Sequence, residues 1–286
     1  MSLRPCTSRI IEEVERVTSR PVVVREDAGL NVLAHVRIAR GDDPIHLLRY
    51  KPGGETPPDY YIVYQCGHVL RLYSAPPDRR FDIGVGPGGR QNMAEQMRES
   101  RIPLEAGNME QTLLGGLITQ LRSIPVGFSI EDWIAKSFPE LASLQKRAAL
   151  AQLAQNLEAI RIAASGVFPP RVGRAGVAMN AAFAAYWARA WHNASVTVPY
   201  KAAGCLDAGT KLMDIYDRTP DDPALDVQLV DDWAVELGLK GWYEAIPFQG
   251  TTLRMSEPVY VDIPVGEFDL SLLPEQARQP GTEAFR

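Results

Sequence analysis

Residues 60–73 read Tyr-Tyr-Ile-Val-Tyr-Gln-Cys-Gly-His-Val-Leu-Arg-Leu-Tyr, and this stretch decides the expected fold. Pro58 and Asp59 precede it and are typical of a helix start, because proline is tolerated in a first turn and aspartate suits a helix N-terminus. Apolar residues then recur at helical spacing: Ile62, Cys66, Val69, Leu70 and Tyr73. The pattern predicts a helix with one buried stripe, and with Tyr64 and His68 one turn apart on the opposite side.

This expected helix carries half of a zinc-binding pattern. In H-E-x-x-H, two histidines one turn apart hold the metal and the glutamate between them activates water. The corresponding positions here are Tyr64, Gln65 and His68, so only the second histidine is present. A tyrosine must lose a proton with a pKa of about 10 before it binds zinc, and the amide of Gln65 cannot take a proton from water. We therefore expect no peptide hydrolysis here, since losing the general base alone costs about 10²–10⁴ in rate.

The segment Cys-Gly-His-Val-Leu-Arg at residues 66–71 resembles the end of the active helix in ImmA/IrrE-like metallopeptidases, often written H-E-x-G-H-x-L. Gly67, His68 and Leu70 match the core of that motif. The approach is similar as well, with an N-terminal helix, short strands and a polar loop before the helix. The resemblance covers roughly residues 5–105 and implies a small zincin-like α/β domain with a degenerate site.

The resemblance also implies a third metal ligand, an acidic residue on the next helix. Glu95 lies at a suitable distance along the chain, and Glu99 is the alternative. If the site still holds zinc, His68 and Glu95 are its expected ligands; otherwise either carboxylate is an ordinary solvated side chain of a helix face. His35 and His46, in strand-like stretches before the helix, would join His68 only if those strands are neighbours.

Two other features are expected to have no catalytic role. Residues 84–89 fit the dinucleotide pattern G-x-G-x-x-G by letter, but no βαβ pattern surrounds them, so we expect a flexible surface loop. Cys66 belongs to the apolar stripe, where a thiol is expected to be inert.

Composition indicates an ordinary globular protein. The chain has 286 residues, of which 45% are hydrophobic and 23% charged, enough for one large core or two modest ones. A net charge of −5 offers no general attraction to nucleic acid, so direct binding to it is not expected. Three distant cysteines form no disulfide framework, and no apolar stretch follows the N-terminal arginines. The apolar segment 175–188 is too short to span a bilayer. These features together predict a cytoplasmic protein without a membrane partner.

The order of predicted elements gives an α+β class, with a small α/β domain over residues 1–125 and a mainly helical domain with a terminal strand segment over 126–286. In the first domain the pattern predicts a helix at 7–18 and strands at 22–25, 32–39 and 45–50. Further along the chain, the pattern predicts helices at 110–122, 139–165, 173–193 and 223–237, and strands within 251–265. It also predicts a short helix that begins with Ser129 as its N-cap.

The first functional hypothesis is a degenerate ImmA/IrrE-like protein that binds a protein partner without cleaving it. Active relatives typically cleave helix-turn-helix repressors, so the resemblance implies a transcriptional regulator as partner and a bacterial or phage-related stress or defence setting. Two alternatives stay open: a divergent zinc metallopeptidase that cleaves a regulatory protein, and an unrelated helical interaction protein. No cofactor is expected under the first hypothesis, and zinc under the second.

Overall fold

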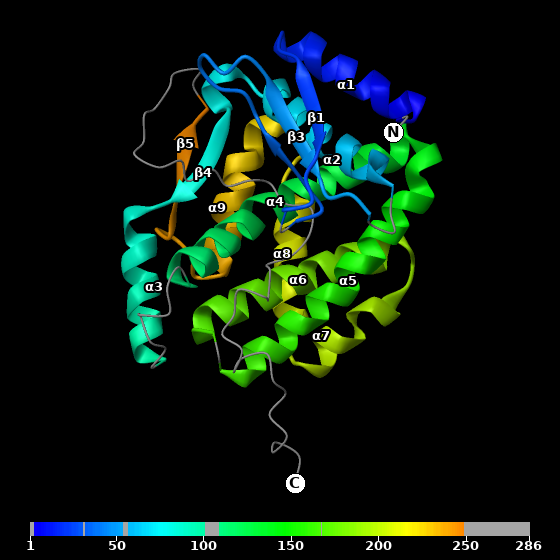
Figure 1. Ribbon diagram of the computed structural model, residues 1–286. Coiled ribbons are helices and arrows are strands. Elements are labelled where there is room, and N and C mark those ends of the chain that lie inside the picture. The colour runs from blue at the N-terminus through cyan, green and yellow to red at the C-terminus, as the bar shows by residue number, and fades with distance from the viewer. Residues whose placement is uncertain (1–2, 31, 54–56, 101–108, 167, 249–286) are drawn as a thin grey trace.

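The computed structural model describes residues 3–30, 32–53, 57–100, 109–166 and 168–248. Its first part is a helix beside a three-stranded mixed sheet (Figure 1). The central strand β3 (His46–Tyr50) pairs in parallel with β1 (Val22–Glu26) and antiparallel with β2 (Ala34–Arg37). Helix α1 (Pro5–Thr18) precedes these strands, and a mainly helical region follows them. The predicted α+β class is therefore confirmed.

Helix α2 (Pro58–Ser74) lies between the sheet and the helical region. It contacts β2 and β3 on one side and the long helix α4 (Met109–Ser137) on the other. Its first turn is fixed to α1, because the Asp59 carboxylate accepts hydrogen bonds from the Arg4 backbone N–H at 2.8 Å and the Thr7 hydroxyl at 2.7 Å. Asp59 thus joins two helices instead of capping its own.

The other described elements are mostly helices that pack around α4 and α6 (Figure 1). In chain order they are η1 (Pro77–Arg79), β4 (Phe81–Val85), α3 (Pro87–Glu99), η2 (Pro139–Leu141), α5 (Ala142–Ser165), α6 (Pro170–Ala190), η3 (Ala194–Thr197), α7 (Val198–Ala202), α8 (Leu206–Arg218), η4 (Pro223–Leu225), α9 (Asp226–Glu236) and β5 (Tyr243–Pro247). The predicted strands within 251–265 lie outside the described residues.

Helix α4 is continuous where the sequence predicted two helices. Pro125 lies inside it, and Ser129, the expected N-cap of a second helix, is a buried residue of its interior. Pro125 and its neighbours are buried, so tertiary packing overrides the proline signal at this point. The expected division between residues 125 and 126 falls within this helix, and the two-domain organisation stays a prediction.

The described core is one connected cluster that draws residues from the sheet, α2 and the later helices. Trp233 and Trp242 are among its largest fully buried side chains. By length and composition α4 is the described helix that could cross a membrane, although 72% of its most apolar window is buried within the protein.

The glycine-rich segment 84–89 is not the expected surface loop. It spans the end of β4 and the start of α3, and β4 pairs antiparallel with β5. A Cβ atom on Gly86 would come within 2.9 Å of the Tyr243 carbonyl group, and one on Gly88 within 2.7 Å of the Gly241 carbonyl oxygen. These glycines therefore allow the late chain to pack against the turn, which explains the pattern without a phosphate ligand.

Two helical glycines should respond to alanine with opposite sign. A Cβ atom on Gly209 of α8 would lie 2.6 Å from the Ala181 carbonyl carbon of α6. This carbon is a backbone atom, so it cannot move aside without a shift of the helix. Gly209→Ala should therefore lower the free energy of unfolding by about 1–3 kcal/mol. Gly115 of α4 has nothing within 4 Å of the same position, so Gly115→Ala should raise it by about 0.5–1 kcal/mol. Urea titration of both variants tests this, and a Gly209→Ala protein as stable as the parent would contradict it.

Candidate functional site

Helix α2 is buried on every side along most of its length. Tyr64 is 9% exposed and His68 is 4% exposed, so the prediction that they face away from the buried side is wrong. The amphipathic pattern failed because α4 covers the face opposite the sheet. Cys66 is 1% exposed, and burial raises the pKa of its thiol to about 12, so its place in the buried stripe is as predicted and its low reactivity stays a prediction.

The His68 ring lies where a positive charge is unfavourable. Its centroid is 4.9 Å from that of Tyr64 in an edge-on contact. Burial, with the nearby positive charges of Arg122 and Arg71, holds the pKa of His68 well below its ordinary value. His68 is therefore a neutral imidazole at physiological pH.

Gln65, at the position of the general base, has a packing role. Its side-chain amide donates a hydrogen bond to the Ala34 carbonyl oxygen at 3.2 Å and so ties α2 to β2. A glutamate there would place an ionised oxygen against a carbonyl oxygen, where neither group can donate. The amide thus fits the fold at this position in a way that an ionised catalytic base does not.

Among the described residues, the other expected ligands do not complete a metal site around His68, although His35 and His46 lie on the neighbouring strands β2 and β3. Glu95 is exposed on α3, which Figure 1 shows at the edge of the molecule beside β4 and β5, whereas α2 lies near its centre. The His46 ring is engaged elsewhere, accepting a hydrogen bond from the Ala39 backbone N–H at 3.0 Å and contacting the Thr18 hydroxyl at 2.9 Å. Across the described ranges, no group of three or more histidine, cysteine, aspartate or glutamate residues could hold a metal ion. The residues present do not fit a catalytic zinc ion.

What the structure offers instead is a cleft between α2 and three helices of the helical region, α4, α5 and α6. Its volume is about 140 Å³, well above the roughly 10–15 Å³ that one water molecule needs. Tyr60, Tyr61 and Tyr64 of α2 line one end. Tyr64, which stands where the H-E-x-x-H pattern has its first histidine, therefore lines this cleft.

A buried carboxylate lies at the α2 end of this cleft. One oxygen of Glu131 accepts a hydrogen bond from the Tyr60 hydroxyl at 2.6 Å, and the other accepts one from the Gln145 amide at 2.7 Å. Burial raises the pKa of Glu131 to about 7, and the hydrogen bonds from Tyr60 and Gln145 oppose part of that rise. Glu131 is thus poised between its neutral and ionised forms near physiological pH.

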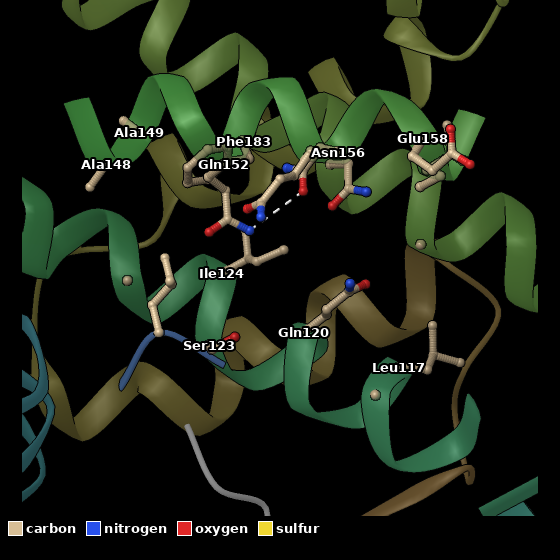
Figure 2. A pocket seen from close by; sticks show the side chains of 18 of the residues that line it. Leu117, Gln120, Ser123, Ile124, Ala148, Ala149, Gln152, Asn156, Glu158 and Phe183 are labelled. Carbon is tan, nitrogen blue, oxygen red and sulfur yellow. Dashed lines mark hydrogen bonds between the residues drawn. The ribbon is translucent and has the colours of Figure 1, made fainter. Parts of the chain in front are cut away.

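Amide side chains face one another further along the cleft. Figure 2 shows Gln152 and Asn156 pointing from α5 toward α4, and Gln120 pointing from α4 toward α5. Gln152 donates a long hydrogen bond of 3.4 Å to Asn156. Each amide has both donor and acceptor capacity, so the cleft can pair with groups of either kind.

No motif marks this site, but the spacing of amide residues in the sequence does. Gln145, Gln152 and Asn156 recur at spacings of seven and four residues on α5, which is one helical face. Polar residues on an otherwise apolar helical face indicate a buried polar site. Glu131 was hidden because residues 129–132 were interpreted as a helix start, where acidic side chains are common.

Comparisons of the chain with models of protein families, with curated proteins and with solved structures found no match. Function is therefore inferred from the cleft and from helix α2.

Proposed function

We propose that this protein binds a segment of a partner polypeptide in the cleft bordered by α2, α4, α5 and α6, and does not hydrolyse it. The observation that carries the proposal is the cleft itself, which is lined by tyrosines of α2 and by amide side chains of α4 and α5. By resemblance of α2, the proposal includes a zincin-like origin, a regulatory protein such as a transcriptional regulator as partner, and a bacterial stress or defence setting in the cytoplasm.

The shape and chemistry of the cleft favour an extended peptide over a compact ligand. The lining residues of α5 run from Ala148 to Ile162, which is about 21 Å along a helix axis. An extended chain of six residues spans about the same length. Its backbone N–H and C=O groups match the paired donors and acceptors of Gln120, Gln152 and Asn156. Tyrosine is also enriched where proteins bind one another, because its ring gives a large contact area with a polar end.

The same residues argue against peptide hydrolysis. Gln65 cannot take a proton from water, and its amide is bonded to the sheet. Tyr64 is buried, and burial raises the pKa of its phenol above the ordinary value, which makes a zinc-binding phenolate still less accessible. The cleft keeps a place for substrate without the groups that would cleave it.

A substitution that fills the cleft should abolish peptide binding. Gly176 of α6 lines the cleft, and a Cβ atom there would meet only the Gln120 side-chain oxygen, at 3.7 Å. Gly176→Trp should therefore be accommodated and occupy the space meant for the peptide. A library of random octapeptides displayed on phage is selected on the parent protein, and enriched peptides are measured by fluorescence anisotropy. Gly176→Trp should weaken their binding by about 30-fold, roughly 2 kcal/mol.

The matched control is Gly115→Trp, also a helical glycine with open space around it but not among the residues that line the cleft. It should change affinity by less than about twofold. If no peptide is enriched, or if both tryptophan variants bind the enriched peptides like the parent, the cleft is not a peptide-binding site.

A further inference from the structure

We infer that the α2 end of the cleft selects a basic side chain, arginine or lysine, of the bound polypeptide, with Glu131 as the group that pairs with its cation. The inference rests on the proposed function and names the chemistry that this cleft recognises. It follows from the charges that line the cleft, from the partners of Glu131 and from the aromatic wall beside it.

The charges of the described lining are all negative. Among the described residues that border the cleft, none is lysine, arginine or histidine, and the charged ones are Glu131 and Glu158. Such a lining disfavours phosphate, carboxylate and nucleic-acid ligands, and it favours neutral or cationic ones.

The two carboxylates differ in what neutralises them. Glu158 forms an ion pair with Arg161 one turn along α5, so its charge is already compensated. Glu131 forms no ion pair with any described arginine, lysine or histidine, and its partners Tyr60 and Gln145 are neutral donors. Buried charges are normally paired. A carboxylate that lines a cleft without a cation of its own is therefore a natural place for a cation brought by a ligand.

The described groups that face Glu131 are neutral or negatively charged. No cationic group faces it from the described elements packed against it: the facing groups are Tyr60 and Tyr64 of α2, Gln145 of α5, Tyr186 of α6 and, on its own helix, Asp132. The ring centroid of Tyr60 lies 5.3 Å from that of Tyr61 and 6.0 Å from that of Tyr64. The negative faces of such rings attract cations, and more strongly where water is excluded.

Charge pairing in the cleft couples binding to deprotonation. A cation favours the ionised form of Glu131, whose pKa in the free protein is about 7. A bound basic residue must therefore displace a proton from most of the protein at pH 6 and from little of it at pH 8. Affinity for a basic peptide should rise about tenfold across this interval.

The test uses the octapeptides enriched on the parent protein. They should share an arginine or lysine at one position, and replacing it with citrulline, a neutral isostere of arginine, should weaken binding by about 10- to 100-fold. The rise in affinity from pH 6 to pH 8 should be present for the basic peptide and absent for the citrulline peptide. This comparison needs no variant protein, so it does not depend on how substitutions are tolerated.

Variants then locate the pairing group. Glu131→Gln should bind the basic and citrulline peptides about equally and without pH dependence, whereas Glu13→Gln, the matched control at an ion-paired carboxylate of α1 that does not line the cleft, should keep the preference of the parent. Two results would overturn the inference and leave the proposed function standing. In the first, Gly176→Trp weakens binding of the enriched peptides, but the peptides share no arginine or lysine position. In the second, the citrulline peptide binds as tightly as the basic peptide. A library with no enriched peptide overturns both.

Discussion

Replacing Arg71 with methionine should lower the free energy of unfolding by about 3–5 kcal/mol. The Arg71 guanidinium donates to both oxygens of Asp226, at 2.8 Å and 2.6 Å, and to Asp221 at 2.7 Å. Its side chain is 13% exposed and that of Asp226 is 8% exposed. Methionine keeps much of the apolar stem but leaves the Asp226 carboxylate buried without its cation, and an unpaired buried charge is costly. Urea titration at pH 7 measures the loss.

Arg189 provides a matched control for this prediction. It also donates two hydrogen bonds to one aspartate, Asp217, but the two side chains are 51% and 47% exposed. Water screens such a pair, so Arg189→Met should cost no more than about 1 kcal/mol. In the double variant Arg71→Met/Asp226→Asn the stranded charge is gone, and part of the lost stability should return. Equal costs for Arg71→Met and Arg189→Met would show that burial does not strengthen the first pair.

The Arg71 pair also shows why the sequence predicts elements better than their assembly. Arg71 follows the motif glycine and histidine in α2, whereas Asp226 begins α9, 155 positions later in the chain. Each residue alone is typical of a helix, with aspartate in a first turn and arginine in a last turn. Nothing in the local pattern says that the two charges meet, because contacts between distant segments leave no periodic trace.

Local patterns were reliable where one face of an element is buried. Strand β3, predicted at 45–50, alternates buried His46, Leu48 and Tyr50 with half-buried residues, as a strand with one covered face does. The predicted ends of helix α2 agree closely with the observed ones, but the predicted exposure of its residues does not. A helix covered by a sheet and by another helix buries polar side chains that a single-stripe interpretation places in solvent.

The same limit applies to the candidate site. The zinc-like pattern in the sequence lies on the helix that borders the cleft, and its zincin-like origin stays a prediction. The pattern could not identify Glu131, because the hydrogen bonds from Tyr60 and Gln145 join three helices that the sequence does not orient. The amide spacing on α5 was visible, and polar residues at helical spacing on an apolar face are the signal to weigh in such a chain.

The pH dependence of stability should identify Glu131 as a carboxyl group that folding forces toward its neutral form. Its pKa rises from an ordinary value of 4.5 to about 7 in the folded protein. The folded state therefore holds this proton more tightly than the unfolded state does. Its contribution to stability is fully present below the unfolded pKa and is lost as pH rises through the folded pKa. Burial at the end of the cleft causes the shift, so the effect belongs to the same geometry as the proposed pairing with a cation.

Glu131→Gln should remove this dependence while keeping the shape of the side chain. Between pH 5 and pH 8 the parent should lose about 2–3 kcal/mol more stability than the variant, since one pKa unit corresponds to about 1.4 kcal/mol. The glutamine oxygen can still accept from the Tyr60 hydroxyl, and the Gln145 amide can turn to accept from the new N–H group. Burial lowers the pKa of His46 to about 4, so its contribution to the stability of the protein is lost as pH falls. This loss is the same in the parent and the variant and therefore cancels in their difference. Urea titrations at pH 5, 6, 7 and 8 give the free energy of unfolding of both proteins as a function of pH. If the two curves run parallel, Glu131 is ionised in the folded protein throughout this range. The cleft itself then already stabilises the negative charge that a cation of the ligand was expected to stabilise.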